Sequence, residues 1–484
     1  MNKNLTKSVS RGMVCMPIFS LLPIAVNATD SSNSDIHYNG NYQRPNFIVI
    51  LTDDMGYQDV GFNGCKDIRT PNIDRIALEG MKFTNAYVTY SVSSPSRAGI
   101  MTGRYGQRFG YERNAQYQPG DPNMGLPLDE MTIAQSLRTV GYTSCAVGKW
   151  HLGAHPTLHP LNRGFDEFFG FLGGGHRYFP EEYRYESYDV NTEENSYRTY
   201  LLKNHDHVKI KGYLTDELSN AAVDFVKTHK DGPFFLYLAY NAPHSPLQAT
   251  DKYLSRYENI KDPKRKKYAA MLSAVDDGVG KLLDYLDEAG IADNTIIWFL
   301  SDNGGPEQTN GSDNGPLRGG KSSTYEGGYH VPYAMRWPGH IPAGKVFTKT
   351  VSSLDIFATA SGLTGAKTNK EKPLDGVNLI PYITGEDTRN PHPVIYLRKF
   401  DNQSFSVRKD DWKLLLFQKN GDVRELYDLA NDLGETKNLI KQHANIADEI
   451  EVLRKEWNNQ LIDPVFEGIL MRKKPEIKKL SKWK

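Results

Sequence analysis

The sequence has little cysteine, no excess of charge of either sign and few long apolar runs. Only 3 of its 484 residues are cysteine, and the two beyond the N-terminal segment, Cys65 and Cys145, would form either one disulfide or two buried free thiols. Its 58 basic residues match its 58 acidic residues, which argues against a general attraction to nucleic acid or to acidic membranes. No later apolar run is long enough to span a bilayer, so we expect a soluble mature protein without a transmembrane segment.

The N-terminus is typical of an export signal. Three basic residues precede an apolar stretch over residues 13–26, and Ala28 ends a segment that suits cleavage by a signal peptidase. We therefore assign residues 1–28 to a signal peptide and 29–44 to a linker, and we expect an exported protein.

Apolar runs alternate with helical patterns along most of the chain. The runs that predict buried strands lie at 46–51, 142–147, 234–240 and 295–300. An apolar stripe at helical spacing predicts a helix over 266–288, and a shorter helix is expected near 72–79. This alternation indicates an α/β fold with a large, mostly parallel sheet sandwiched by helices.

The pattern changes after about residue 390. Short strands are expected at 394–397, 405–408 and 412–417. A helix with Ile450 and Trp457 on one face follows them. We therefore expect a smaller C-terminal α+β subdomain on a short antiparallel sheet, with a main domain over 45–385 and the subdomain over 386–484.

Oxygen-bearing side chains follow two of the predicted strands. Asp53 and Asp54 come after the first strand, and Asp302 and Asn303 come after the strand at 295–300. Because sites in parallel sheets gather beyond the carboxyl ends of the strands, we expect both pairs in one place. Calcium takes about six to eight oxygen ligands, so the two pairs predict a site for a hard divalent cation. The alternative for each pair is a turn or a helix cap.

The segment Ser93-Ser94-Pro95-Ser96-Arg97 predicts a hydroxyl held at an anion site. Pro95 suits the first position of a helix, so Ser93 should lie just before the helix N-terminus, where N–H groups favour negative charge. Arg97 adds a full positive charge one turn later. The alternative is a serine-rich loop that caps a helix.

Six segments, in order, resemble the formylglycine-dependent sulfatases of the alkaline phosphatase superfamily. They are RPNFIVILTDDMGYQDVG, SVSSPSRAGIMTGR, AVGKWHLG, NAPHSP, FLSDNGG and GPLRGGKSSTYEGGYHVP. Near the C-terminus, DDWKLLLF and ELYDLANDLGETKNLI resemble the small second domain of that family. The resemblance implies an alkaline phosphatase-like sheet in the main domain, which would be the catalytic domain, and hydrolysis of a sulfate ester.

The resemblance also implies a modified nucleophile. Ser93 would be oxidised after synthesis to formylglycine, whose hydrated form attacks sulfur with one hydroxyl and uses the other to expel sulfate. Position 93 holds serine rather than cysteine, which implies a serine-type, oxygen-independent maturation enzyme as a partner. Without that partner the chain should fold but stay nearly inactive.

The remaining implied roles belong to residues that bind charge or move protons. One calcium ion would be bound by Asp53, Asp54, residue 93, Asp302 and Asn303. Arg97 would stabilise the nucleophile, while Lys149 and Lys321 would hold sulfate oxygens. His151 would assist the release of sulfate, and His244 would protonate the leaving oxygen.

Substrate choice is less visible in the sequence. Export and a serine-type motif resemble bacterial sulfatases that desulfate host or dietary glycans, in the periplasm or at the cell surface. We expect an exo-acting enzyme on sulfated galactose or N-acetylgalactosamine. His176 and Arg177 open a tyrosine-rich segment that suits stacking on sugars, although a packing loop is the alternative. We expect His176, Arg177 and the more distant Arg69 to recognise the sugar.

Two other functions stay open at this point. A phosphoester or phosphonate hydrolase of the same superfamily would often bind two transition metals and need more histidine and aspartate ligands. A non-catalytic protein that binds sulfated glycans through an unmodified Ser93 would have no use for a leaving-group acid such as His244.

Overall fold

A computed structural model describes residues 44–469 except residue 191. The predicted signal peptide and nearly all of the predicted linker lie outside the described residues. Within the described part of the chain, no helix is both long enough and apolar enough to cross a bilayer.

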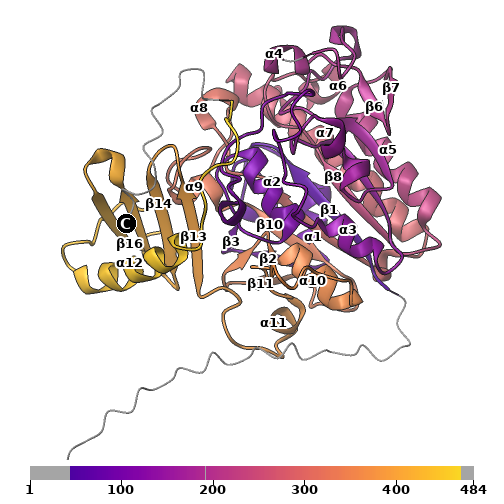
Figure 1. Cartoon of the computed structure of the whole chain (residues 1–484). Helices are drawn as coiled ribbons and strands as arrows, with labels where there is room; N and C mark the ends of the chain where they lie inside the picture. The colour runs from indigo at the N-terminus through magenta and orange to yellow at the C-terminus, as the bar shows by residue number, and fades with distance from the viewer. Residues whose placement is uncertain (1–43, 191, 470–484) are drawn as a thin grey trace, which may run out of the picture. The chain divides into compact units, whose positions relative to one another are not determined.

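A large sheet forms the centre of the described chain (Figure 1). Its strands, from edge to edge, are β11 (Lys345–Phe347), β2 (Met81–Phe83), β10 (Tyr333–Arg336), β9 (Thr295–Ser301), β1 (Asn46–Thr52), β8 (Phe234–Ala239), β4 (Thr143–Lys149), β5 (Glu167–Phe171), β6 (Leu201–Lys203) and β7 (Asp206–Val208). The consecutive strands from β9 to β5 run parallel, and antiparallel pairs flank them on both sides. The outermost pair at one edge, β11 and β2, is parallel. The predicted, mostly parallel sheet is therefore confirmed. A separate short pair joins β3 (Ala86–Tyr87) to β12 (Val351–Ser352).

Helices cover both faces of this sheet (Figure 1). The helices of this part of the chain are α1 (Pro71–Leu78), α2 (Ser93–Thr102), α3 (Ile133–Arg138), α4 (Glu193–Ser196), α5 (Leu214–His229), α6 (Asp251–Leu254), α7 (Pro263–Glu288), α8 (Glu307–Asn310), α9 (Glu326–Tyr329), α10 (Asp355–Thr364) and α11 (Ile380–Thr384). Strand β1 is buried on both faces of the sheet, which explains why its successive side chains over residues 47–51 are all apolar. Phe47 and Val49 belong to the core that includes residues of α2, α3 and α10, whereas Ile48 and Ile50 belong to the core that includes residues of α1, α5 and α7.

The C-terminal part contains the expected antiparallel sheet and one further strand. Its members are β13 (Val394–Lys399), β14 (Ser404–Lys409), β15 (Trp412–Phe417) and β16 (Val423–Asp428), followed by α12 (Ala444–Asn458). Val407 and Leu414 of the sheet share a buried cluster with Ile450 of α12. This packing explains the apolar stripe on that helix. The domain boundary near residue 385 stays a prediction.

The start of α2 differs from the expectation. The helix begins at Ser93 itself, so Pro95 is its third residue rather than its first. The difference is tolerated because the first four N–H groups of a helix have no intrahelical partner, and proline removes only one of them. Ser93 therefore lies within the first turn of the helix.

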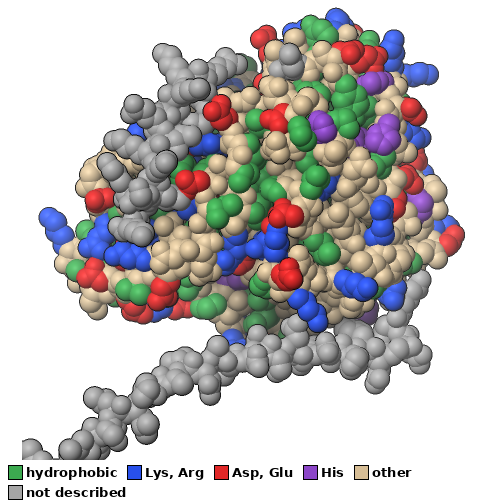
Figure 2. Space-filling model, viewed as in Figure 1, with side chains coloured by type: hydrophobic (Ala, Val, Ile, Leu, Met, Phe, Trp, Pro, Cys, Tyr) green, Lys and Arg blue, Asp and Glu red, His purple; other side chains and the backbone are tan. Residues whose placement is uncertain are grey.

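The structure also bears on the predictions about the two cysteines and about the balance of charge. Cys65 and Cys145 are both free thiols, so the disulfide alternative does not hold in this structure. Basic and acidic side chains are interspersed over the face that Figure 2 shows, in keeping with the balanced composition.

Candidate active site

Two parallel strands bring the predicted acidic pairs together. β1 and β9 pair in register up to Thr52 and Ser301, so Asp53 and Asp302 follow them side by side. The backbone N–H of Asp54 donates to Asp302 Oδ1 at 3.2 Å. Asn303 Nδ2 donates to Asp54 Oδ1 at 2.7 Å, which joins the two pairs through their side chains.

The hydroxyl of Ser93 reaches the same cluster from the N-terminal turn of α2. Ser93 Oγ donates to Asp53 Oδ1 at 3.1 Å and lies 3.3 Å from Asn303 Oδ1. The side chain is almost completely buried. The predicted nucleophile and the predicted cation ligands thus occupy one site, although they come from segments up to about 250 residues apart.

Three cationic side chains surround the acidic cluster. Arg97 Nη2 lies 2.8 Å from Asp302 Oδ2. Lys149 Nζ donates to Asp53 Oδ2 at 2.6 Å, and Lys321 Nζ donates to Asp54 Oδ2 at 2.7 Å. Each carboxylate therefore has its own cation, and three negative charges balance three positive ones before any ligand binds.

These pairs control the charge state of the cluster. Burial alone would raise the pKa of Asp53, but Lys149, His244 and Arg97 outweigh it and leave the pKa below its ordinary value. Burial would lower the pKa of Lys321, but Asp54 outweighs it and raises that pKa. The carboxylate of Asp53 and the ammonium of Lys321 therefore persist in a largely buried site.

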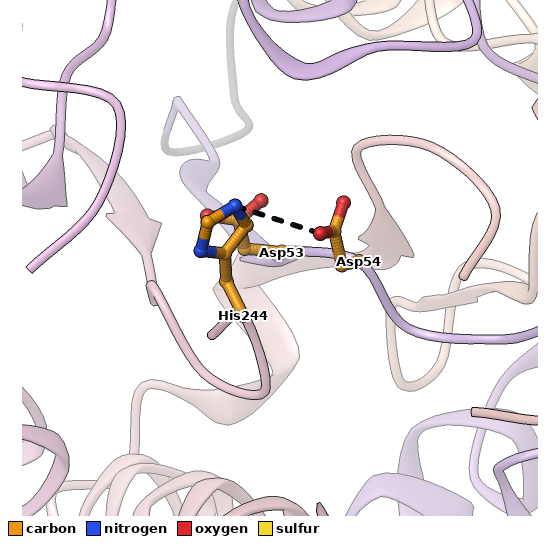
Figure 3. A group of neighbouring side chains, drawn as sticks. All are labelled: Asp53, Asp54 and His244. Carbon is orange, nitrogen blue, oxygen red and sulfur yellow. Dashed lines mark ion pairs between the residues drawn. The ribbon is translucent and has the colours of Figure 1, made fainter. Parts of the chain in front are cut away.

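His244 lies on the accessible side of the site. It follows β8 in a turn held by the Tyr178 hydroxyl, which lies 2.8 Å from the carbonyl oxygen of His244. Its Nδ1 lies 2.6 Å from the Ser245 carbonyl oxygen, and its Nε2 lies 3.5 Å from Asp54 Oδ2 (Figure 3). Because a carbonyl only accepts, Nδ1 carries a proton, and Nε2 is the nitrogen that can exchange one with a ligand.

His151 is buried near the positive charges of Lys149 and Arg97. Neither of its ring nitrogens has a hydrogen-bond partner in the described chain, and its φ is 56°. Burial lowers the pKa of His151 well below 6.5, and the neighbouring Lys149 and Arg97 lower it further. A neutral imidazole with two unpartnered nitrogens is able to accept a proton from a bound group.

The donor set fits a hard divalent cation. Ligand atoms of Asp53, Asp54 and His244 lie within 4.8 Å of one another (Figure 3). The oxygens of Ser93 and Asn303 enter the same space, at the separations given above. Carboxylate, amide and hydroxyl oxygens about 3 Å apart suit the coordination sphere of calcium better than that of a soft metal.

The structure does not support direct sugar contact by His176. Its side chain is completely buried, and its ring nitrogens lie 2.8 Å from the Arg177 carbonyl oxygen and 2.9 Å from that of Thr199. The ring also packs against Phe171 and Tyr183. His176 therefore holds the tyrosine-rich segment together, which corrects our expectation that it binds the sugar.

The other two predicted recognition residues are accessible. Arg177 is partly exposed and lies 3.5 Å from a carboxylate oxygen of Glu182. Arg69 is exposed just before α1, and its only described hydrogen bonds are those of its backbone with the Tyr257 hydroxyl. Neither makes a described contact with the acidic cluster, so sugar recognition by either residue stays a prediction.

One buried acid near the site escaped the sequence analysis. Glu193 is partly buried in the first turn of α4, and its neighbour Glu194 is exposed. Two consecutive glutamates after a capping threonine are typical of an exposed helix start. No local signal distinguishes the buried one from the exposed one.

Comparisons with known proteins show which family the chain belongs to. A family model described as Sulfatase matches residues 45–366, and one described as N-sulphoglucosamine sulphohydrolase, C-terminal, matches residues 320–462. N-acetylgalactosamine-6-sulfatase of Mus musculus is 36% identical over 376 residues, which cover 74% of this chain and 69% of that protein. The uncharacterized sulfatase YdeN of Escherichia coli (strain K12) is 31% identical, over 88% of this chain and 87% of its own.

A solved structure is similar over most of the fold. The crystal structure of Ps i-CgsB in complex with k-i-k-neocarrahexaose superposes with a TM-score of 0.82 and 43% sequence identity, covering 87% of this chain and 94% of that chain. The similarity therefore includes both the large sheet and the C-terminal part.

Proposed function

The chain belongs to the sulfatase family of the alkaline phosphatase superfamily and is a sulfuric ester hydrolase; within that family, we propose that it desulfates a carbohydrate through a formylglycine at position 93 beside one calcium ion. One observation carries the proposal. The Ser93 hydroxyl lies where oxygens of Asp53 and Asn303 converge, inside a ring of three cations. An unmodified serine has no adjacent base there, because Asp53 is itself paired with Lys149.

The charge balance of the site supports sulfate as the group that binds. The neutral set of three carboxylates and three cations would gain two positive charges from a calcium ion, which would lower the pKa of the nucleophile and attract the sulfuryl oxygens. Lys149 and Lys321 would add fixed positive charge on either side of the sulfuryl group. Their positions are held by ion pairs before the substrate arrives, so little reorganisation is needed.

The two histidines would divide the proton transfers between them. His244 is on the accessible side and has its Nε2 available, so it would protonate the leaving oxygen of the sugar. His151 is buried and unpartnered, so it would accept the proton of the second hydroxyl of residue 93 when sulfate is released. Arg97, which binds Asp302, would stabilise the negative charge that forms on residue 93.

The relatives support a sugar of the galactose series. One is an N-acetylgalactosamine-6-sulfatase, and another was crystallised with a neocarrahexaose. We therefore propose exo-acting hydrolysis of a sulfate on galactose or N-acetylgalactosamine. The serine at position 93 and the N-terminal pattern further support a bacterial, serine-type maturation enzyme as partner and a periplasmic or cell-surface location.

The test starts from protein made with and without a serine-type maturation enzyme. Mass spectrometry of the peptide around Ser93 should show the loss of two hydrogens only in the matured protein. That protein should release sulfate from sulfated galactose or N-acetylgalactosamine, and the unmatured protein and Ser93→Ala should not. Matched aryl sulfate and aryl phosphate esters separate the sulfatase from a phosphoester or phosphonate hydrolase, and faster release of phosphate would overturn the proposal.

A further inference from the structure

The buried carboxylate of Glu193 faces the same space as the unpartnered imidazole of His151. Glu193 Oε2 accepts the backbone N–H of Tyr117 at 3.2 Å. Its other oxygen, Oε1, is buried without a hydrogen-bond partner in the described chain, as are both ring nitrogens of His151. Unpartnered buried polar atoms are rare and costly, so two that face each other call for an explanation.

Gly174 shows how close these atoms are. A Cβ on Gly174 would stand 2.7 Å from Glu193 Oε1 and 2.9 Å from His151 Nε2. Both atoms therefore lie within hydrogen-bond reach of one point, and they are less than about 6 Å apart without touching directly. One water molecule or one hydroxyl between the two atoms, at van der Waals distance from Gly174 Cα, could bond to both, and a Cβ at position 174 would crowd it.

The charges around His151 explain why a carboxylate is needed there. Lys149 and Arg97 act against a protonated His151, and Lys321 and His244 add to this effect. The carboxylates of the acidic cluster each pair with a cation of their own. Glu193 forms no ion pair within the described residues. Burial raises its pKa, the Tyr117 N–H and the charge of Lys149 oppose that shift, and a protonated His151 would further favour the carboxylate form.

We propose that Glu193 is a positioning residue for His151 in the step that releases sulfate. In that step the C–O bond between residue 93 and sulfate breaks, sulfate leaves with the electron pair, and the aldehyde re-forms as the second hydroxyl gives its proton to His151. Glu193, through one bridging water or hydroxyl at Nε2, orients the imidazole and stabilises the imidazolium. The inference rests on the proposed function, because it assigns a role within the same catalytic cycle.

The test compares Glu193→Gln with Glu194→Gln in matured enzyme on an aryl sulfate. The first variant keeps the shape but loses the charge, while the second changes the exposed neighbour. Glu193→Gln should lower kcat about tenfold or more and produce a burst of about one equivalent of phenol per site, because ester cleavage precedes sulfate release. The acid limb of its kcat–pH profile should move to lower pH, since His151 loses a stabilising negative charge. Glu194→Gln should behave as the parent enzyme.

Several results would overturn the inference. They are an unchanged kcat for Glu193→Gln, a reduced kcat without a burst, and an acid limb that stays in place. Gly174→Ala provides a second variant if Glu193→Gln fails to fold, and it should also show a burst with slow turnover. If the parent enzyme releases sulfate normally and these variants match it, only the role of Glu193 fails. If the matured parent releases no sulfate, the proposed function itself fails.

Discussion

Replacing Lys149 with methionine separates the structural role of this residue from its catalytic role. Lys149 Nζ lies 2.6 Å from Asp53 Oδ2, and both side chains are completely buried. Removing one partner of a buried ion pair costs about 3–5 kcal/mol, because the other charge is left uncompensated. Arg97 Nη2 lies 3.8 Å from the same Asp53 oxygen, so part of the compensation remains and we expect a loss near the lower limit, about 3 kcal/mol.

The same change should reduce catalysis by a different mechanism. Lys149 is a preorganised cation beside the position of the sulfuryl group, and deleting one such donor costs about 10²–10³ in kcat. The double variant Asp53→Asn/Lys149→Met removes both charges, so it should recover much of the stability. It should recover no activity, because Asp53 is also a proposed calcium ligand.

A matched control lies in the C-terminal part of the chain. Lys413 is also completely buried, and its Nζ lies 2.8 Å from carboxylate oxygens of both Glu326 and Glu435. Lys413→Met should lose a similar amount of stability but keep the kcat of the folded enzyme, because no proposed catalytic or metal-binding residue is among its partners. Urea unfolding and sulfate release, each measured with and without excess calcium, give both quantities.

Calcium provides the sharpest contrast between the two variants. An ion bound to Asp53 would neutralise the charge that Lys149→Met exposes, so calcium should reduce the stability deficit of that variant. It should leave the deficit of Lys413→Met unchanged. The reasoning would be refuted by a Lys149→Met protein as stable as the parent, or by an equal loss of kcat in Lys413→Met.

Three further predictions concern the acid, the ion and pH. His244→Gln should lower kcat on a sugar sulfate about 10²–10⁴-fold but lower kcat on an aryl sulfate with an acidic phenol far less, because only a poor leaving group needs protonation. Equal losses on the two substrates would contradict the role of His244 as the leaving-group acid. Chelation of calcium should abolish sulfate release. Calcium at about 100 times its Kd should stabilise the protein against thermal unfolding by about 2.7 kcal/mol. A midpoint of thermal unfolding that does not change with calcium would count against the site. Burial raises the pKa of Glu435 to about 7, although Lys413 opposes this. As the pH rises, Glu435 loses its proton in the unfolded chain before it does so in the folded protein. The contribution of Glu435 to the free energy of unfolding is therefore fully present below about pH 4 and is lost as the pH rises through about 7. As the pH rises from about 5 to about 7.5, the free energy of unfolding measured in urea should therefore fall less for Glu435→Gln than for the parent. An equal fall in both proteins would refute this.

The sequence alone determined the features that depend on local patterns. Strand β1 is covered on both faces, so every residue from Asn46 to Thr52 is buried, and its run Phe47–Leu51 is continuously apolar. The oxygen-bearing residues that follow it and β9 could be assigned to one site because parallel strands end at one edge of the sheet. The length of α7 also followed from its apolar stripe, since a long helix repeats the same face many times.

Only the tertiary structure decided which polar residues outside those motifs are buried and what they face. His176 is closed off by a carbonyl group from Thr199, more than 20 residues away, and no periodic pattern connects the two positions. Glu193 and Glu194 are alike in sequence, but the helix that carries them directs one toward His151 and the other into solvent. Burial of a single loop side chain depends on contacts between distant segments, whereas strand and helix burial repeats along the chain and so leaves a pattern in the sequence.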